Sequence, residues 1–361
     1  MKSTLNVKNC SWDQFASLPT AQKIEFFKKD GRLYDVLISQ QFNRELLEEL
    51  INIANATRRI AKTKEGMIWL KNLLPHKRAM LYFIQPSTRT FLSFLNACHI
   101  LGISISEVRD PSTSSEVKGE TYEDTIRTFS SYVDVIIMRH PQEGYSEKAT
   151  WVLNNSDRPV PVFNAGSGRD QHPTQALLDI YTLHRNFAKR GGIDGKTIAM
   201  VGDLQRGRTV RSLSYLLSNY EDVTLYFVAP ERFQMKEDIK SFLEKKDISY
   251  HEVDNIDKIL GKADAVYMTR IQDEHDVSGE SKNYDYSNYR IGPENLSALK
   301  EDAIIMHPLP RRNEIDPIVD NDPRAKYWRQ ERNGMWIRAA LLIKVFNVEE
   351  SVIEYYDSTA I

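Results

Sequence analysis

The chain has 361 residues, 41% of them hydrophobic, and its 48 basic and 50 acidic residues give a net charge of −2. This length favours two domains, each with its own core, and the balanced charge argues against a general nucleic-acid binder. The chain has two cysteines, Cys10 and Cys98, which is too few for a disulfide scaffold. The sequence shows neither a secretory signal nor a run of about eighteen apolar residues, so we expect a cytoplasmic protein without membrane contact.

Apolar runs of strand length alternate with longer amphipathic segments along the chain. Because these runs are unbroken, they indicate strands that helices cover on both faces. The predicted strands are Met80–Ile84, Val133–Met138, Val160–Phe163, Thr197–Val201, Val223–Val228, Ala263–Met268 and Ala303–Met306. The predicted helices are Leu92–Leu101, Tyr122–Tyr132, Thr174–Phe187, Val210–Ser218, Met235–Lys245 and Met335–Phe346. This alternation predicts an α/β fold with two doubly wound parallel sheets.

The domain organisation is predicted from a break in the pattern at Gly191-Gly192, after the helix that ends at Phe187. We expect an N-terminal extension over 1–40, a first domain over 41–187, a second over 188–334, and a C-terminal segment, 335–361, whose helix crosses the domain junction and packs back on the first domain. The aromatic residues of the extension favour docking over disorder.

The first predicted strand is followed by Pro86-Ser87-Thr88-Arg89-Thr90, which opens the next helix. The first N–H groups of a helix lack internal partners and lie at the positive end of its dipole, so they can bind an anion. Hydroxyl groups and the fork of Arg89 would add donors. The alternative is that Ser87 or Thr88 only caps the helix.

Two further segments of the first half place polar groups after strands, where open parallel sheets bind their ligands. Arg139 follows the second strand, and His172 and Gln175 come where the helix after the third strand begins. A neutral imidazole can donate a hydrogen bond to a carbonyl oxygen without adding a charge. Taken singly, Arg139 could be a solvated surface residue and His172 a structural one.

The second half repeats this arrangement with Arg208 and Arg270 after two of its strands. After the last strand, the prolines of His307-Pro308-Leu309-Pro310 restrict the backbone and leave carbonyl groups free to accept from an ammonium group. Arginines in both halves indicate a phosphate beside a dicarboxylate.

Several motifs are absent from the sequence, namely GxxxxGK[ST], HExxH and CxxC, and the glycines after Val201 do not match GxGxxG. The acidic residues form no obvious magnesium cluster. We therefore expect a transfer reaction that uses neither a metal nor a cofactor.

Six ordered motifs between about Arg78 and Phe346 resemble the aspartate carbamoyltransferase family, within the wider aspartate/ornithine carbamoyltransferases. They are Ser87-Thr88-Arg89-Thr90, Met138-Arg139-His140-Pro141-Gln142-Glu143-Gly144, Gln171-His172-Pro173-Thr174-Gln175, Val201-Gly202-Asp203 with Gly207-Arg208-Thr209-Val210, Tyr267-Met268-Thr269-Arg270-Ile271-Gln272, and His307-Pro308-Leu309-Pro310-Arg311. The resemblance implies transfer of the carbamoyl group of carbamoyl phosphate to the amine of L-aspartate, a step of pyrimidine biosynthesis.

The resemblance also implies a role for each site residue. It makes 41–187 the carbamoyl phosphate domain and 188–334 the aspartate domain. The implied catalytic residues are Arg89, Thr90, Arg139 and His172, and the implied carbamoyl phosphate ligands are these four with Ser87, Thr88, Gln175, Ser114 and Lys118. The implied aspartate ligands are Lys118, Arg208, Arg270, Gln272 and the carbonyl group of Leu309, with Glu274 and Glu314 bracing Arg270.

The loop with Ser114 and Lys118 matches one that enters the active site of a neighbouring subunit in the family, so the resemblance implies a homotrimer with shared sites. If the resemblance is set aside, Lys118 is interpreted as a solvated charge on a loop. The sequence leaves open whether regulatory chains attach.

The chain departs from the family pattern at several charged positions. Gln85 stands for a usual glutamate, Phe91 for an arginine and Val117 for a lysine, while Ser167 and Asn313 stand where acidic residues are common. These changes keep open a carbamoyltransferase with another amino-acid acceptor and a non-catalytic carbamoyl phosphate binder. A nicotinamide-dependent dehydrogenase, which could share this architecture, is a third alternative, but the chain lacks its glycine fingerprint.

Arg270 and Gln272, which the chain retains, favour aspartate over ornithine as acceptor, because a guanidinium suits a dicarboxylate and repels the ornithine side chain. Pro308 also stands where ornithine-using relatives carry a cysteine, and their Ser-Met-Gly motif is absent. A long polar insert, 273–292, leaves room for a modified acceptor.

Overall fold

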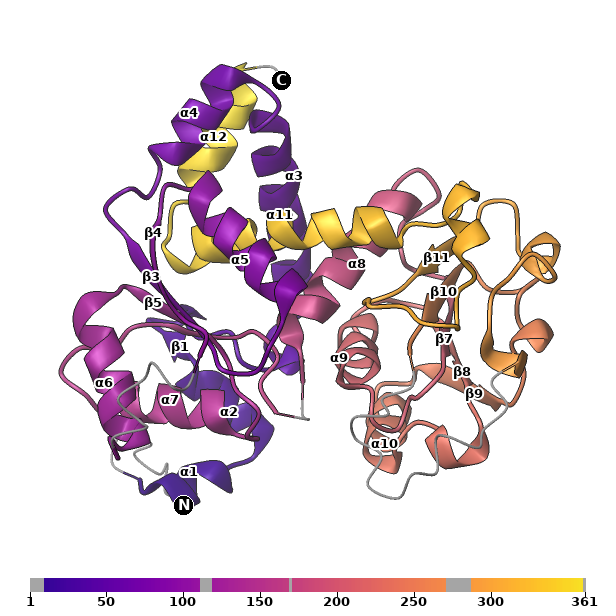
Figure 1. Ribbon diagram of the computed structural model, residues 1–361, viewed down its shortest axis with the longest axis horizontal. Helices are drawn as coiled ribbons and strands as arrows, with labels where there is room; N and C mark the ends of the chain where they lie inside the picture. Colours follow the sequence, from indigo (N-terminus) through magenta and orange to yellow (C-terminus); the bar gives the residue numbers. More distant parts are fainter. Residues whose placement is uncertain (1–9, 111–118, 169–170, 271–286, 360–361) are drawn as a thin grey trace. The chain divides into compact units, whose positions relative to one another are not determined.

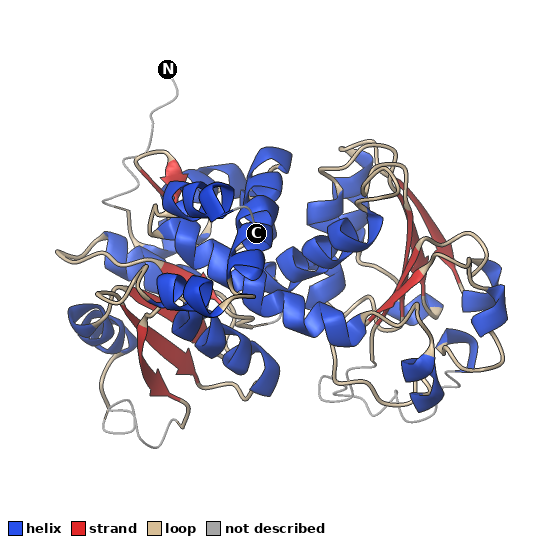
Figure 2. Ribbon diagram, turned by 90° about the horizontal axis from the view of Figure 1, so that it is seen from above, coloured by secondary structure: helices blue, strands red, loops and turns tan. Residues whose placement is uncertain are grey.

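A computed structural model describes residues 10–110, 119–168, 171–270 and 287–359, which divide into two compact units. The first unit comprises Met1–Thr174 and Gly334–Ile361, and the second comprises Gln175–Asn333. Each unit holds a parallel sheet with helices on both faces (Figures 1 and 2). The predicted α/β class with parallel sheets in two domains is confirmed. The predicted domain ranges, with a division after residue 187, stay a prediction.

The parallel sheet of the first unit has the strand order β4-β3-β5-β6. Its strands are β3 (Arg78–Phe83), β4 (Ser104–Val108), β5 (Val135–Arg139) and β6 (Val162–Asn164). Its longer helices are α3 (Arg44–Ile60), α4 (Lys64–Lys71), α5 (Thr88–Ile100), α6 (Tyr122–Tyr132), α7 (Tyr145–Asn154) and α12 (Glu349–Thr359). The predicted strands correspond to β3, β5 and β6, which are almost fully buried. The strand β4 was not predicted, because this edge strand has exposed and half-buried residues and therefore no unbroken apolar run.

The carboxyl ends of β3, β5 and β6 meet at one edge of this sheet. Phe83 lies opposite Arg139, and Met138 lies opposite Asn164. The backbone N–H of Gln85 donates to the carbonyl oxygen of Arg139 at 3.2 Å. The chain leaves β3 toward β4 on one side and returns to β5 on the other, so the strand order reverses between β3 and β5, and ligands of such sheets bind at this reversal.

The sheet of the second unit has the order β11-β10-β7-β8-β9, and its strand order reverses between β7 and β10. Its strands are β7 (Thr197–Val201), β8 (Thr224–Val228), β9 (Ser249–Val253), β10 (Ala265–Met268) and β11 (Ile304–Met306). Helices α9 (Arg208–Leu217) and α10 (Glu237–Glu244) belong to this unit, whereas α8 (Pro173–Phe187) and α11 (Tyr327–Val345) each contribute to both. The missed edge strand β9 again has exposed residues in its burial pattern.

The N-terminal segment from residue 10 docks on the first unit, as its aromatic residues predict. It forms α1 (Trp12–Ala16), α2 (Thr20–Phe26), β1 (Lys28–Lys29) and β2 (Arg32–Leu33). Phe15 and Phe27 are fully buried, and the Trp151 indole donates to the carbonyl oxygen of Cys10 at 3.1 Å. Residues 35–41, the N-terminal strip, then run beside β6, where Val36 lies parallel to Phe163.

The C-terminal segment, which belongs to the first unit, contacts α5 through Arg338 of α11, whose side chain is buried. Its guanidinium donates to the Ser93 hydroxyl of α5 at 2.6 Å and lies 4.9 Å from the centre of the Phe94 ring. A buried guanidinium needs such polar and aromatic partners because its charge cannot be removed at physiological pH.

Asp35, at the start of the N-terminal strip, gives the stability of the first unit a pH dependence. Burial raises the pKa of its carboxyl group to about 8, although the Val162 N–H donates to it at 2.8 Å. Between about pH 4 and pH 8 the folded chain therefore holds a proton that the unfolded chain releases. The contribution of Asp35 to stability is complete below pH 4 and is lost as the pH rises through 8.

We expect Asp35→Asn, which keeps an acceptor for Val162, to remove this pH dependence. Relative to the wild type, the melting temperature of the variant should rise by at least about 2 °C between pH 5 and pH 9. Thermal unfolding at both pH values checks this. The assignment fails if the two proteins respond to pH in parallel.

Candidate active site

The segment after β3 forms the open N-terminus of a helix. Ser87 is the N-cap of α5, and its side chain makes no capping hydrogen bond, as expected for a helix N-terminus that binds an anion. The Thr90 side chain is buried in that turn, while Arg89 is half-buried. The structure thus brings the four predicted phosphate ligands, Ser87 to Thr90, into one helical turn.

The side chains of Arg139 and His172 both approach Gly166, which follows β6. A Cβ atom built on Gly166 would lie 2.8 Å from Cδ2 of His172 and 2.9 Å from Nη1 of Arg139. The same guanidinium nitrogen donates to the carbonyl oxygen of Ala165 at 3.3 Å. Gly166 has φ +100°, which glycine tolerates far better than other residues. Arg139 and His172 are 33 positions apart in the sequence, and they come close together because Gly166 has no side chain that would keep them apart.

Ser167 fixes this turn against the loop after β5. Its hydroxyl oxygen accepts from the His140 backbone N–H and from the Ser146 hydroxyl, both at 3.0 Å. The His140 ring stacks on Tyr145, and burial lowers the pKa of His140 to about 4, so His140 is neutral at physiological pH. Neutral groups alone therefore hold Ser167, one of the departures named in the sequence analysis.

Gln175 lies in the first turn of α8, within the second unit, and its amide donates to the buried carboxylate of Asp179 at 3.0 Å. Asp179 also accepts from the Tyr267 hydroxyl at 2.8 Å and from Gln330 at 2.7 Å. Burial and the neighbouring Asp179 raise the pKa of Tyr267 well above its ordinary value, so this phenol stays protonated. Gln330 in turn accepts from the backbone N–H of His307 at 2.9 Å.

The strand-order reversal of the second unit brings the turn after β7 against the residues after β10. A Cβ atom on Gly202, which has φ +119°, would overlap the carbonyl oxygen of Thr269. Arg270 follows Thr269 directly, and Arg208 begins α9, six positions after Gly202. Both guanidinium groups are on half-buried residues, where a charged ligand can reach them.

The loop after β11 is held by His307. Its Nδ1 accepts from the Leu309 N–H at 2.7 Å, which leaves the proton on Nε2, 2.7 Å from the carboxylate of Glu314. Burial would raise the pKa of Glu314, but the hydrogen bond from His307 outweighs it and holds this pKa below its ordinary value. Leu309 has φ +55° and precedes a cis proline. The predicted contact of Glu314 with Arg270 stays a prediction.

Four predicted site residues lie outside the described residues: Ser114, Lys118, Gln272 and Glu274. The approach of Arg139 and His172 to Gly166, and the hydrogen bonds of Ser167, were not predicted. The small residues after β6 indicated a tight turn, but the contact across it depends on the pairing of β5 with β6. Within the described ranges we find no group of three or more His, Cys, Asp or Glu residues that could hold a metal ion, and no helix that could span a membrane.

Known proteins resemble both halves of the chain. The family model for the aspartate/ornithine carbamoyltransferase carbamoyl-P binding domain matches residues 35–185, and that for the Asp/Orn binding domain matches residues 194–345. Aspartate carbamoyltransferase 1, chloroplastic, of Pisum sativum is 44% identical over 315 residues, 86% of this chain and 78% of that protein.

Two further matches cover nearly the whole length of the proteins concerned. The aspartate carbamoyltransferase catalytic subunit of Finegoldia magna is 38% identical, over 87% of this chain and 98% of that protein. The crystal structure of aspartate transcarbamoylase from Trypanosoma cruzi in complex with carbamoyl phosphate and aspartate superposes with a TM-score of 0.79 at 37% identity, over 87% of this chain and 97% of that one.

Proposed function

The chain belongs to the aspartate/ornithine carbamoyltransferase family, and we propose that it transfers the carbamoyl group of carbamoyl phosphate to L-aspartate, giving N-carbamoyl-L-aspartate and phosphate. The observation that carries the assignment of residues is the contact of Gly166 with both Arg139 and His172. It places a guanidinium and an imidazole together at the edge of the sheet where the α5 N-terminus opens.

Most of the proposed carbamoyl phosphate ligands belong to the first unit. The N–H groups and hydroxyls of Ser87, Thr88 and Thr90, with the Arg89 guanidinium, would bind the phosphate. Arg139 and His172, together with Thr90, would donate to the carbonyl oxygen, where negative charge develops during attack. Ser114, Lys118 and Gln175 complete the proposed carbamoyl phosphate ligands.

The reaction forms a C–N bond from the aspartate amine to the carbamoyl carbon and breaks the bond from that carbon to the phosphate oxygen. The leaving phosphate can accept the amine proton, so the transfer needs no dedicated base on the protein. The contribution of the chain is then to orient both substrates and to stabilise the oxyanion.

The second unit supplies the proposed aspartate ligands, which are Arg208, Arg270, Gln272 and the Leu309 carbonyl group, with Lys118 from the loop of a neighbouring chain. Glu274 and Glu314 would orient Arg270. We propose that the chain forms a homotrimer, because the sequence of the loop 113–120 matches the family loop that enters the active site of a neighbouring subunit. The cytoplasm stays a prediction, since the Pisum sativum relative is named chloroplastic.

Arg270→Ala tests the aspartate half of the site. We expect the KM for aspartate to rise at least about thirtyfold, because the loss of a charge-assisted contact of about 2 kcal/mol weakens binding by that factor. The KM for carbamoyl phosphate should stay within about twofold. Steady-state kinetics with each substrate varied in turn measures both constants.

Arg211→Ala is the matched control, because Arg211 lies on α9 of the same unit and pairs with the exposed Asp238 at 2.6 Å. Surface ion pairs contribute little, so we expect near wild-type kinetics. An unchanged KM for aspartate in Arg270→Ala would show that Arg270 is not an aspartate ligand.

A further inference from the structure

The N-terminal strip, residues 35–41, is tied to the turn that carries Gly166. Asn164, at the end of β6, donates from its backbone N–H to the carbonyl oxygen of Val36 at 2.8 Å and from its side chain to that of Leu37 at 3.1 Å. The other end of the same amide accepts from the N–H groups of Gly166 and Ser167 at 2.9 and 2.7 Å. One buried side chain therefore joins the strip to the turn.

A second tie reaches the residue immediately before His172. The amide oxygen of Gln171 accepts from the backbone N–H of Ser39, and its amide nitrogen donates to the side-chain oxygen of Gln40, both at 2.7 Å. Because a backbone N–H can only donate, the contact with Ser39 fixes which end of the Gln171 amide is oxygen. The nitrogen must then face Gln40, so the orientation of the pair is unambiguous.

The strip is itself held rigid by Gln41. Its amide oxygen accepts from the N–H groups of Leu37 and Ile38 at 2.7 and 3.0 Å, and its amide nitrogen donates to the carbonyl oxygen of Asp35 at 2.7 Å. A single buried side chain thus bridges both ends of the strip, which can serve as a fixed reference for Gln171.

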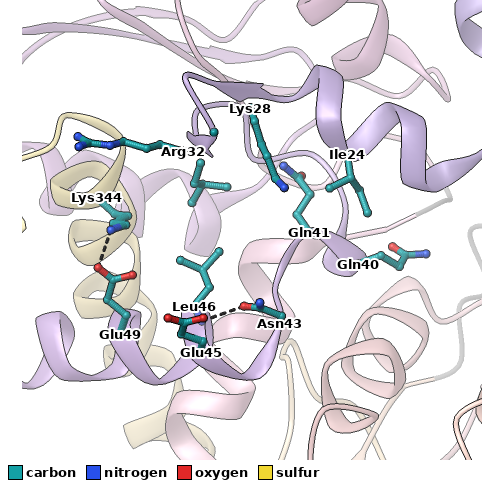
Figure 3. Close-up of a pocket in the computed structure, with 12 residues that line it drawn as sticks. Ile24, Lys28, Arg32, Gln40, Gln41, Asn43, Glu45, Leu46, Glu49 and Lys344 are labelled. Atoms are coloured by element: carbon teal, nitrogen blue, oxygen red, sulfur yellow. Dashed lines mark hydrogen bonds and ion pairs between the residues drawn. The ribbon is translucent and has the colours of Figure 1, made fainter. Parts of the chain in front are cut away.

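Packing alone does not fix the position of Gln40. Gln40 and Gln41 border a cavity of about 440 Å³ between the N-terminal segment, α3 and Lys344 of α11. Figure 3 shows the two glutamines on neighbouring positions of this wall, apart from the Lys344–Glu49 pair. A side chain that borders a cavity lacks packing partners on that side. The hydrogen bond with Gln171 therefore has more influence on the position of Gln40.

We propose that Gln40 and Gln171 are positioning residues that hold His172 where its imidazole meets the carbamoyl oxygen. The inference rests on the proposed function, in which His172 donates to that oxygen. Neither glutamine contacts the reacting atoms. They act through the rigid strip on one side and through the peptide bond that joins Gln171 to His172 on the other.

Gln40→Ala tests this role. We expect kcat to fall fivefold to tenfold, since small displacements of an oxyanion donor are costly in the transition state. The KM for carbamoyl phosphate should change less than about twofold, and the melting temperature by less than about 2 °C. A turnover equal to that of the wild type would overturn the proposal, as would a loss explained by a lowered melting temperature.

Two further variants separate positioning from other effects. Gln40→Glu keeps an oxygen that can accept from Gln171, so we expect it to recover at least half of wild-type kcat. Glu45→Gln changes a charge on the wall of the same cavity without touching Gln171, and we expect no change. Equal losses in Gln40→Glu and Gln40→Ala would contradict a role through the Gln171 hydrogen bond.

Hydrogen exchange supplies a readout that does not depend on activity. The N–H of Ser39 donates to Gln171, so in Gln40→Ala we expect its exchange to become at least fivefold faster, with no change in Glu45→Gln. Unchanged exchange would overturn the coupling. A wild-type chain that exchanges as expected but transfers no carbamoyl group would instead overturn the proposed function.

Discussion

Gly166→Ala is expected to fold and to lose at least about 100-fold in kcat. The added methyl group would lie within 3 Å of both the His172 ring and the Arg139 guanidinium, closer than Cβ atoms approach other groups. Both side chains must then move away from the places where they would meet the carbamoyl oxygen. A displacement of about 1 Å in a catalytic group costs about two orders of magnitude.

A second glycine separates this clash from backbone strain. Gly191 has φ +82°, but a Cβ atom there has no neighbour within 4 Å. Gly191→Ala therefore imposes a similar strain without displacing a side chain, and we expect it to keep most of its activity. Steady-state kinetics and thermal unfolding of the two variants side by side make the comparison. If Gly166→Ala turns over like Gly191→Ala, Arg139 and His172 do not act together.

Arg89→Ala is expected to keep the fold and to lose about three orders of magnitude in kcat/KM for carbamoyl phosphate. The half-buried Arg89 lies in the first turn of α5, where its guanidinium would pair with the phosphate and stabilise the charge of the leaving group. Arg89→Lys keeps a charge but not the planar fork, so its activity should fall between those of the wild type and Arg89→Ala.

The exposed Arg59 of α3 provides the control for this loss of charge. Arg59→Ala lowers the net charge of the same unit equally, and we expect its kcat/KM to stay within about twofold of the wild type. Circular dichroism and the melting temperature show whether each variant is folded. Near-normal turnover in Arg89→Ala would show that the phosphate does not bind at the start of α5.

The buried part of both sheets was predictable because its strands are apolar throughout. Strands such as β5 and β7 need helices on both faces, and an unbroken apolar run is their signature. The edge strands β4 and β9 carry polar residues on a face exposed to solvent, so the same criterion fails for them. An amphipathic helix such as α3, with buried residues at helical spacing, could have been found and was missed.

The candidate site was predictable where its chemistry is local in sequence. Four consecutive residues at the start of α5 carry the phosphate motif, and the rule that ligands bind beyond the carboxyl ends of strands pointed to Arg139 and His172. The approach of both to Gly166, the tie of Asn164 to this turn and the bond of Gln40 to Gln171 depend on strand register and on a parallel bridge to Val36. No spacing in the sequence encodes such contacts.

The most direct test of the account is to incubate the purified chain with carbamoyl phosphate and either L-aspartate or L-ornithine, and to quantify the ureido product. We expect N-carbamoyl-L-aspartate and an equal amount of phosphate with aspartate, and no product with ornithine. Such a result would also show that Gln85 and Phe91 support the reaction in place of the usual charged residues. Binding of carbamoyl phosphate without a ureido product from aspartate would contradict the proposed transfer.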